Sequence, residues 1–304
     1  MESPKEAEYS VLPQSHTDII AVLSSRPTVH GQVSLMDQKG RSFSDLTVNE
    51  FVNFFLLAQK IAAQLKSALS VNRVAMASDG TVTNLIPLHG VAQDWKPVLN
   101  LEETFHPVYP GFFTSKTGPK MANTTLDEIQ SRICAISGLK PPHSLSFKGD
   151  PSDTNLFARI VRGDLEQWRI WEDDNHVALL TPFANTPGYT ILVPRAHLSS
   201  DIFHLGNSDY EALMRASYTV MEVLRKAFAV ERVGVFFEGF EIDYTHVKLI
   251  PAHSGGDWKE GEDVPSTPFF EAYPGYITTQ RGPPADDSSL KKLCNILRDK
   301  LTLI

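Results

Sequence analysis

One segment of the chain occurs twice, and this internal repeat restricts the possible folds more than any other feature of the sequence. The motif Tyr-Pro-Gly begins at Tyr109 and again at Tyr273, and 273 minus 109 gives an offset of 164 residues. Each copy of the motif is followed by Gly-Pro, and at the same offset LIPLH from Leu85 matches LIPAH from Leu249. We therefore predict two units of the same design in one chain.

The offset between the copies falls to 159 nearer the N-terminus, where Arg73-Val74 matches Arg232-Val233 (232 minus 73). Each copy also has one long segment with apolar residues at helical spacing. The sequences TVNE (47–50) and SDYE (208–211) are predicted capping boxes at the starts of these two helices. Because an amphipathic helix needs an apolar surface to cover, each copy is predicted to pack its helix on an antiparallel sheet, in an α+β fold.

The order of these features divides the chain into four parts. Residues 1–15 are predicted to be a flexible tail, and the first copy is predicted to run from 16 to 138. Residues 139–153 are rich in Pro and Ser and are predicted to be a linker, which leaves 154–304 for the second copy. A chain of 304 residues is long enough for two such domains.

The composition is that of a soluble globular protein, with 42% hydrophobic and 21% charged residues. The formal net charge of -8 argues against non-specific nucleic-acid binding, which needs a basic surface. The only cysteines, Cys134 and Cys294, have no metal-binding spacing, so no metal or other cofactor is predicted. No apolar run reaches membrane-spanning length, and the N-terminus lacks the pattern of a secretory signal. We therefore expect a cytoplasmic protein without nucleic-acid or membrane partners.

The stretch from Tyr244 to Pro251 is predicted to carry the functional site. Read as a strand, its two-residue period places Tyr244, His246 and Lys248 on one face. A hydroxyl, an imidazole and an ammonium held in register can converge on one anionic group, so the pattern predicts a site for a small phosphate-like substrate. The alternative interpretation is the solvated face of a half-buried strand.

Several short motifs surround this stretch in a fixed order. They are Glu172-Asp173-Asp174, Thr186-Pro187-Gly188 before a strand, Val193-Pro194-Arg195-Ala196-His197 after it, Glu238-Gly239, and His246 followed by Pro251. With these motifs, the second copy resembles the histidine-triad superfamily from about 155 to 253. The resemblance implies that His246, in the middle slot of the triad motif, is the nucleophile.

The resemblance also assigns roles to other positions. Tyr244 and Lys248 stand in the slots of the flanking histidines. Tyr244 would either donate a hydrogen bond to the phosphoryl group or orient His246, and Lys248 would face the phosphoryl oxygens. The charge of Lys248 would also keep His246 neutral near neutral pH. His197 is in a position to reach the leaving group. Four positions that contact substrate in the family hold residues other than the usual ones: Thr181, Tyr189, Phe237 and Glu241.

The first copy has Val82 and Asn84 where the second has His246 and Lys248, so it is predicted to be inactive. Histidine-triad proteins commonly pair two protomers through sheet and helix. The resemblance therefore implies a monomer in which the two copies form an internal pseudo-dimer. The segment from Tyr273 and its twin are expected to cross to the other copy.

Three functions follow from these observations. The first is a hydrolase or transferase that acts on a nucleotide-like phosphoester or phosphoramidate through a covalent His246 intermediate. The second is an enzyme on another anionic metabolite, in which His246, Lys248 and Tyr244 act as acid, base and anion clamp. The third is a ligand-binding protein without catalysis. The changed triad and the inactive first copy are the observations that support this alternative.

Overall fold

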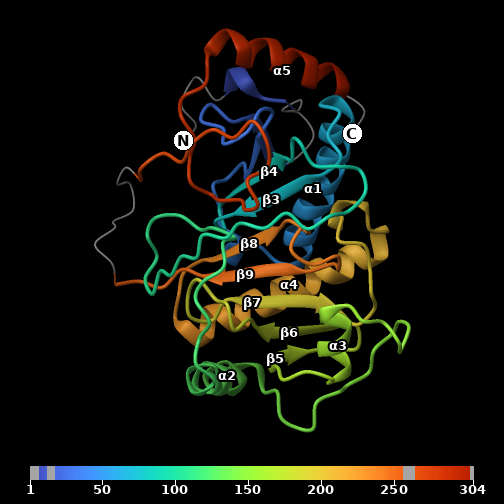
Figure 1. Cartoon of the computed structure of the whole chain (residues 1–304). Coiled ribbons are helices and arrows are strands. Elements are labelled where there is room, and N and C mark those ends of the chain that lie inside the picture. The colour runs from blue at the N-terminus through green and yellow to red at the C-terminus, as the bar shows by residue number, and fades with distance from the viewer. Residues whose placement is uncertain (1–6, 12–17, 256–263, 302–304) are drawn as a thin grey trace.

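The computed structural model describes residues 7–11, 18–255 and 264–301 (Figure 1). In these residues, nine strands form one antiparallel sheet in the order β1-β2-β4-β3-β8-β9-β7-β6-β5. The strands are β1 (Ile19–Leu23), β2 (Val33–Asp37), β3 (Val74–Ser78), β4 (Val82–Pro87), β5 (Trp168–Glu172), β6 (His176–Leu180), β7 (Thr190–Pro194), β8 (Val233–Phe237) and β9 (Val247–Pro251). The α-helices are α1 (Val48–Ala68), α2 (Asn123–Ser137), α3 (Leu156–Arg162), α4 (Asn207–Phe228) and α5 (Asp287–Leu301). The predicted α+β class is confirmed, and no helix in the described ranges has the length and apolar character that a bilayer crossing requires.

The sheet has two halves with the same strand order, read outward in opposite directions from the centre. β3, β4, β2 and β1 form one half, and β8, β9, β7 and β6 form the other, with β5 added at its outer edge. The halves join where Ala77 of β3 lies opposite Phe236 of β8, and these residues differ by 159 positions (236 minus 77). The neighbouring pairs of this ladder are Met76 with Phe237 and Ser78 with Val235. A twofold rotation about the central pair would exchange the two neighbouring pairs with each other. The halves therefore form an internal pseudo-dimer, as predicted.

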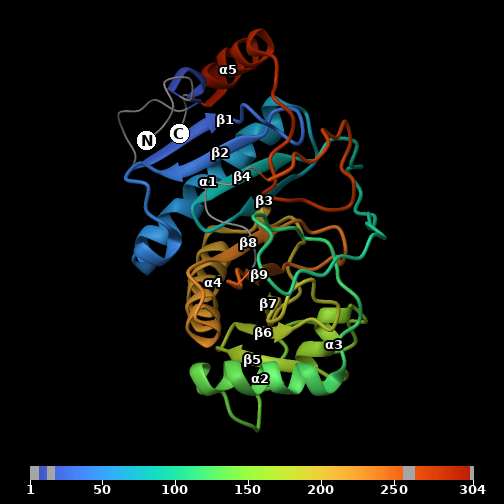
Figure 2. The ribbon, with the colours of Figure 1, turned by 90° about the vertical axis from the view of Figure 1, so that its left-hand side faces the viewer.

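The two faces of the sheet are covered differently. α1 and α4 lie on one face (Figure 2). Their apolar sides bury residues such as Phe55 and Val220 against Val235 and Leu249 of the sheet, in one continuous core. The other face is covered by α3 and by long segments without regular structure, which contribute Phe113 among others. Because strand residues alternate between faces, His246 and Lys248 lie on this second face, away from α4.

The two main helices begin differently, although both were predicted to have capping boxes. α1 begins with the predicted one, because the Thr47 hydroxyl accepts from the Glu50 amide and the Glu50 carboxylate accepts from the Thr47 amide. α4 begins one residue before Ser208, with Gly206 as N-cap and no side-chain cap. Glu211 pairs with Arg215 one turn later, at 2.8 Å. The second prediction was wrong because the motif lies inside the first turn of the helix.

The segments after each half cross to the other half, as predicted for the Tyr273 segment and its twin. They meet at a bridge between Thr114 and Thr278, which are again 164 positions apart (278 minus 114). Beyond this bridge, α2 packs on β5 and α4, and α5 packs on α1 (Figure 1). Trp168 of β5 donates to Asp127 of α2 at 2.8 Å, and Arg298 of α5 donates to the carbonyl of Ser10 at 2.6 Å. Each terminal helix therefore stabilises the half to which it does not belong in sequence.

The glycine of each repeated Gly-Pro lies where two backbones touch. A Cβ atom on Gly118 would come within 2.1 Å of the Ala184 carbonyl oxygen, and one on Gly282 within 1.9 Å of the Pro27 carbonyl oxygen. The amide of Gly118 donates to Phe183 at 2.8 Å, and that of Gly282 donates to Arg26 at 3.0 Å. The repeat thus keeps a glycine at both places because no side chain fits between the crossing segment and the loop below it.

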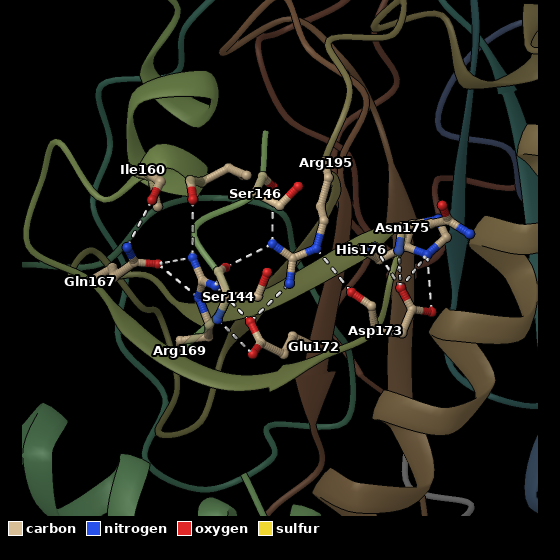
Figure 3. A network of polar contacts seen from close by, with 11 residues as sticks. Ser144, Ser146, Ile160, Gln167, Arg169, Glu172, Asp173, Asn175, His176 and Arg195 are labelled. Atoms are coloured by element: carbon tan, nitrogen blue, oxygen red, sulfur yellow. Dashed lines mark hydrogen bonds and ion pairs between the residues drawn. The ribbon is translucent and has the colours of Figure 1, made fainter. Parts of the chain in front are cut away.

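The stretch 139–153, predicted to be a linker, is bound to the second half by a buried polar network (Figure 3). Glu172 accepts from Arg169 at 2.6 Å and from Arg195 at 2.9 Å, and both arginine side chains are buried. Both guanidinium groups also donate to the carbonyl of Ser144, Arg195 at 2.8 Å. Buried guanidinium groups need acceptors for all their donors, so this network holds the stretch against the sheet.

Candidate functional site

A cavity of about 380 Å³ lies on the sheet face opposite α4, in the second half of the molecule. Its walls are mostly apolar, and they include Leu156, Phe157, Trp168, Leu180, Phe183 and Ile242. His246 and Lys248, which the sequence analysis placed on one strand face, both line this cavity. Small-molecule sites are typically apolar cavities of roughly 300 to 1,000 Å³ with a few polar groups.

His246 is held in one orientation beside this cavity. Its Nδ1 atom lies 2.8 Å from the carbonyl oxygen of Tyr244, and its ring packs against Phe157 of α3 at a centroid distance of 5.3 Å. Because a carbonyl oxygen only accepts, Nδ1 carries the proton and Nε2 keeps its lone pair. Burial lowers the pKa of His246 to about 4, and the charge of Lys248 adds to this shift. The imidazole is therefore neutral near neutral pH, with Nε2 available as a nucleophile.

Lys248 is buried and its ammonium group is saturated with partners. Its Nζ atom lies 3.1 Å from Glu238, 3.3 Å from Glu241 and 3.4 Å from the carbonyl oxygen of Ser115. Burial alone would lower the pKa of Lys248, but the carboxylates of Glu238 and Glu241 outweigh burial and raise it. An ammonium has three donors, so all of them are used within the protein.

This saturation changes the electrostatics predicted for the site. One lysine and two carboxylates sum to a charge of -1 while His246 is neutral. The predicted positive charge against the phosphoryl oxygens is thus already compensated by Glu238 and Glu241. The two carboxylates differ in exposure, because the Glu238 side chain is 4% exposed and the Glu241 side chain is 41% exposed. Glu241 is therefore the more accessible partner of Lys248.

Three of the four predicted substrate-binding residues line the same cavity, namely Thr181, Tyr189 and Glu241. Burial raises the pKa of Tyr189 well above its ordinary value, so its hydroxyl stays protonated. Lys248 lowers the pKa of Glu241, which stays ionised even though burial opposes this. The cavity thus has a neutral donor, a neutral imidazole and an ion pair close together.

Tyr244 and His197, predicted to be catalytic, do not line the cavity. The Tyr244 hydroxyl is buried and donates to the carbonyl of Pro194 at 2.7 Å. Tyr244 orients His246 through its backbone carbonyl and not through its hydroxyl. His197 stacks on the Tyr244 ring at 4.7 Å and is held by Asp153 at 2.6 Å. His197 therefore supports the strand next to the site and does not face the cavity.

Phe237 is also absent from the cavity, in contrast to its predicted substrate contact. Its ring lies 5.9 Å from Phe55 and 5.9 Å from Phe203, in the core beneath α1 and α4. Phe236 takes the opposite face, next to Phe113. Neighbouring strand residues point to opposite faces, so a shift of one position moves a side chain from site to core.

A second cavity of about 230 Å³ adjoins the first and shares Thr117, Glu241 and Lys248 with it. Its other walls come partly from the first half, including Asn100, Glu103 and Lys116, and partly from the second half, namely Glu238, Tyr273 and Gly275. The two cavities thus meet at the Lys248–Glu241 pair. Within the described residues, no group of three or more His, Cys, Asp or Glu side chains is arranged to hold a metal ion.

The sequence analysis missed two contributions to this site. Glu238 was interpreted only as part of a turn, because Asp79-Gly80 repeats it, whereas its buried carboxylate binds Lys248 and the hydroxyl of Tyr273. Ser115 and Thr117 reach the site from the first half. They lie within the repeated segment, between Tyr-Pro-Gly and Gly-Pro, that was expected to cross, and this position could have indicated their role.

Two relatives agree in sequence with the histidine-triad resemblance. An uncharacterized HIT-like protein of Chlamydia muridarum is 24% identical over 80 residues, which are 26% of this chain and 62% of that protein. The protein Hit of Bacillus subtilis is 22% identical over 120 residues, covering 36% of this chain and 81% of that protein. A GalT-like protein of Arabidopsis thaliana superposes over 79% of this chain and 75% of its own, with a TM-score of 0.49 and 10% identity. No protein-family model matches the chain.

Proposed function

We propose that this protein is a histidine-triad-like hydrolase or transferase that acts on a nucleotide-like phosphoester or phosphoramidate through a covalent His246 intermediate. The observation that carries the proposal is the neutral imidazole beside the 380 Å³ cavity, with Nδ1 bound to a carbonyl and Nε2 left for a substrate. The similarity to HIT proteins in sequence supports it.

In the proposed reaction, Nε2 of His246 attacks the phosphorus atom, and a bond from nitrogen to phosphorus forms as the bond to the leaving group breaks. The leaving group takes a proton from water. The Nδ1–H bond to Tyr244 stabilises the positive charge that develops on the phosphorylated ring. Water, or the hydroxyl group of another acceptor, then attacks the phosphorus atom as the bond from nitrogen to phosphorus breaks. Its proton goes to solvent and replaces the one that the leaving group took, and His246 is neutral again.

The walls of the two cavities indicate which part of the substrate each cavity would hold. The apolar walls of the larger cavity suit a flat ring system such as a base, and the polar smaller cavity suits the leaving group. The reacting phosphoryl group would lie between them, next to Lys248. Because the local charge is already negative, a phosphodiester or phosphoramidate with one charge fits better than a phosphate monoester with two.

Covalent trapping tests the proposed intermediate. A nucleoside phosphoramidate with a good leaving group should add one nucleoside monophosphoryl group to the wild type, as measured by intact-protein mass spectrometry. His246→Ala should remain unlabelled, while His204→Ala, which removes an exposed histidine outside the cavity, should label like the wild type. Labelling of His246→Ala, or of none of the three proteins, would refute the covalent mechanism.

Glu241→Gln should speed up the same labelling reaction. The substitution removes the carboxylate that competes with the substrate for Lys248, so we expect a gain of roughly tenfold, the size of one charge-assisted hydrogen bond. Glu166→Gln is the matched control, because Glu166 lines the same cavity but its carboxylate contacts Asn123 and not Lys248. A slower reaction in Glu241→Gln would show that the carboxylate takes part directly.

One observation favours a second candidate, the binding of an uncharged ligand without catalysis. The three donors of Lys248 are all occupied, and most of the cavity wall is apolar. This candidate predicts that ligand binding survives His246→Ala and that neither protein is labelled. The remaining function, an enzyme that uses His246, Lys248 and Tyr244 as acid, base and anion clamp, is not favoured because the Tyr244 hydroxyl is bound to Pro194.

We also infer that the two halves arose by duplication of one unit, corresponding to residues 16–138 and 154–304, and that the chain functions as a monomer. The matching strand orders and the pairs at offsets of 159 and 164 support this inference. The pairing that two separate protomers would make is made within one chain, so the central edge of each half is already covered.

A further inference from the structure

A third cavity, of about 170 Å³, lies in the first half at the place that corresponds to the candidate site. Val82 and Asn84 of β4 line it, and these are the positions 164 residues before His246 and Lys248 (246 minus 82, 248 minus 84). Thr279 and Arg281, from the second copy of the repeated motif, form another wall. Ser115 and Thr117 take the equivalent places at the candidate site (279 minus 115, 281 minus 117).

The charge of this cavity is opposite in sign to that of the candidate site. Arg26 and Arg281 line it together with Asp79, which gives two positive charges and one negative, or +1. The Asp79 carboxylate accepts from the amides of Thr81 and Val82 in its own turn, both at 2.8 Å. Within the described part of the chain, the Arg281 guanidinium has no side-chain partner, so it remains available to an anion.

Hydrogen-bond donors without partners also line the cavity. Gln32 is 4% exposed, and its Oε1 atom accepts from the amide of Thr28 at 2.8 Å. This bond fixes the side-chain amide, so Nε2 is the atom left toward the cavity. Thr279 Oγ1 accepts from the amide of Phe113 at 2.9 Å, which leaves its hydroxyl proton free to donate. The site therefore offers neutral donors and the Arg281 guanidinium, while the Arg26 guanidinium also donates to the Gly282 carbonyl and the Ser266 hydroxyl.

From this arrangement we propose that the first half binds a small tetrahedral oxyanion of the phosphate type at a non-catalytic site formed by Arg26, Arg281 and Gln32. The volume of 170 Å³ is below that of typical drug-sized sites, so the ligand is free phosphate or the end of a small phosphate monoester. Among the described residues that line the cavity there is no histidine, because Val82 stands in the place of His246. The site does not depend on the chemistry proposed for His246.

Isothermal titration calorimetry with inorganic phosphate, and in parallel with glycerol phosphate, tests this site at low ionic strength, where charge interactions are least screened. Wild type and His246→Ala should bind one phosphate equally. Arg281→Gln should bind at least roughly tenfold more weakly, as expected for the loss of a charge-assisted hydrogen bond. Arg215→Gln, which removes an exposed arginine on α4, is the control and should bind like the wild type.

Three results would overturn the proposal. The first is an absence of saturable phosphate binding by the wild type. The second is an equal effect of Arg281→Gln and Arg215→Gln on the affinity for phosphate. In the third, His246→Ala would lose the binding that Arg281→Gln retains, which would place the anion in the candidate active site. Binding of glycerol phosphate but not of free phosphate would support the site and identify a monoester as its ligand.

Discussion

At the scale of single residues, the environment of His246 determines its protonation as much as its chemical type does. Burial and the charge of Lys248 lower its pKa to about 4, while the bond from Nδ1 to Tyr244 selects one tautomer. Lys248 is affected in the opposite direction, because neighbouring carboxylates raise its pKa. Two titratable groups on neighbouring positions of one face are thus driven to a neutral and a charged state.

His246 should make the folded protein less stable in mild acid. In the unfolded chain a histidine has a pKa near 6.5, so the unfolded state takes up a proton below this pH while folded His246 does not until about pH 4. The stability it contributes is complete above pH 6.5 and is lost as the pH falls toward 4. Urea titrations should show that the wild type loses about 2 kcal/mol more than His246→Asn between pH 7 and pH 5.

Asparagine is suitable for this comparison because its side-chain amide can still donate to the Tyr244 carbonyl. His204→Asn, at an exposed position, should keep the pH dependence of the wild type. Equal losses in wild type and His246→Asn would mean that the imidazole is not buried in neutral form.

At the scale of secondary structure elements, α1 and α4 occupy equivalent places but begin with different caps. The difference arises because Thr47 precedes α1, whereas the similar motif at 208–211 lies inside the first turn of α4. Both helices nevertheless bury their apolar sides on the same sheet face. Tertiary packing therefore stabilises each helix, and the cap adds a local contribution.

Thr47→Ala should lower the free energy of unfolding by about 1 kcal/mol, because it removes the hydroxyl that accepts from the Glu50 amide. Ser208→Ala should change it by only a few tenths of a kcal/mol, since Gly206 is the N-cap of α4. Urea denaturation of the two variants measures both values. A larger loss in Ser208→Ala than in Thr47→Ala would contradict the observed caps.

At the scale of the whole molecule, the crossing segments connect the halves more firmly than one strand pair would. α2 packs on β5 and α4, α5 packs on α1, and Thr114 meets Thr278 between them. The candidate site also depends on this exchange, because Ser115 and Thr117 come from the first half. A separated second half would therefore have an incomplete site.

The halves should stay together after the chain is cut between Lys140 and Pro141, which are both exposed. The β3–β8 ladder and the exchanged helices then hold two fragments as they would hold two protomers. Size-exclusion chromatography after complete cleavage at an inserted protease site should give one peak at the position of the uncut protein. Two separate peaks in native buffer would show that the covalent connection is required.

The sequence by itself determined the α+β class, the two long amphipathic helices and the strand pattern that places His246 and Lys248 on one face. These features depend on local patterns, namely the spacing of apolar residues, the cap at Thr47 and the repeated motif, and such patterns are set by neighbours along the chain. The resemblance then selected His246 among ten histidines.

Only the tertiary structure decided the charge of each cavity and the face that each side chain takes. Glu238 and Glu241 neutralise Lys248 because a loop folds over β9, and Phe237 enters the core because of the register of β8. Arg26 and Arg281 share a cavity because a segment from the end of the chain crosses to its beginning. Such contacts join residues far apart in sequence, so no local pattern reveals them.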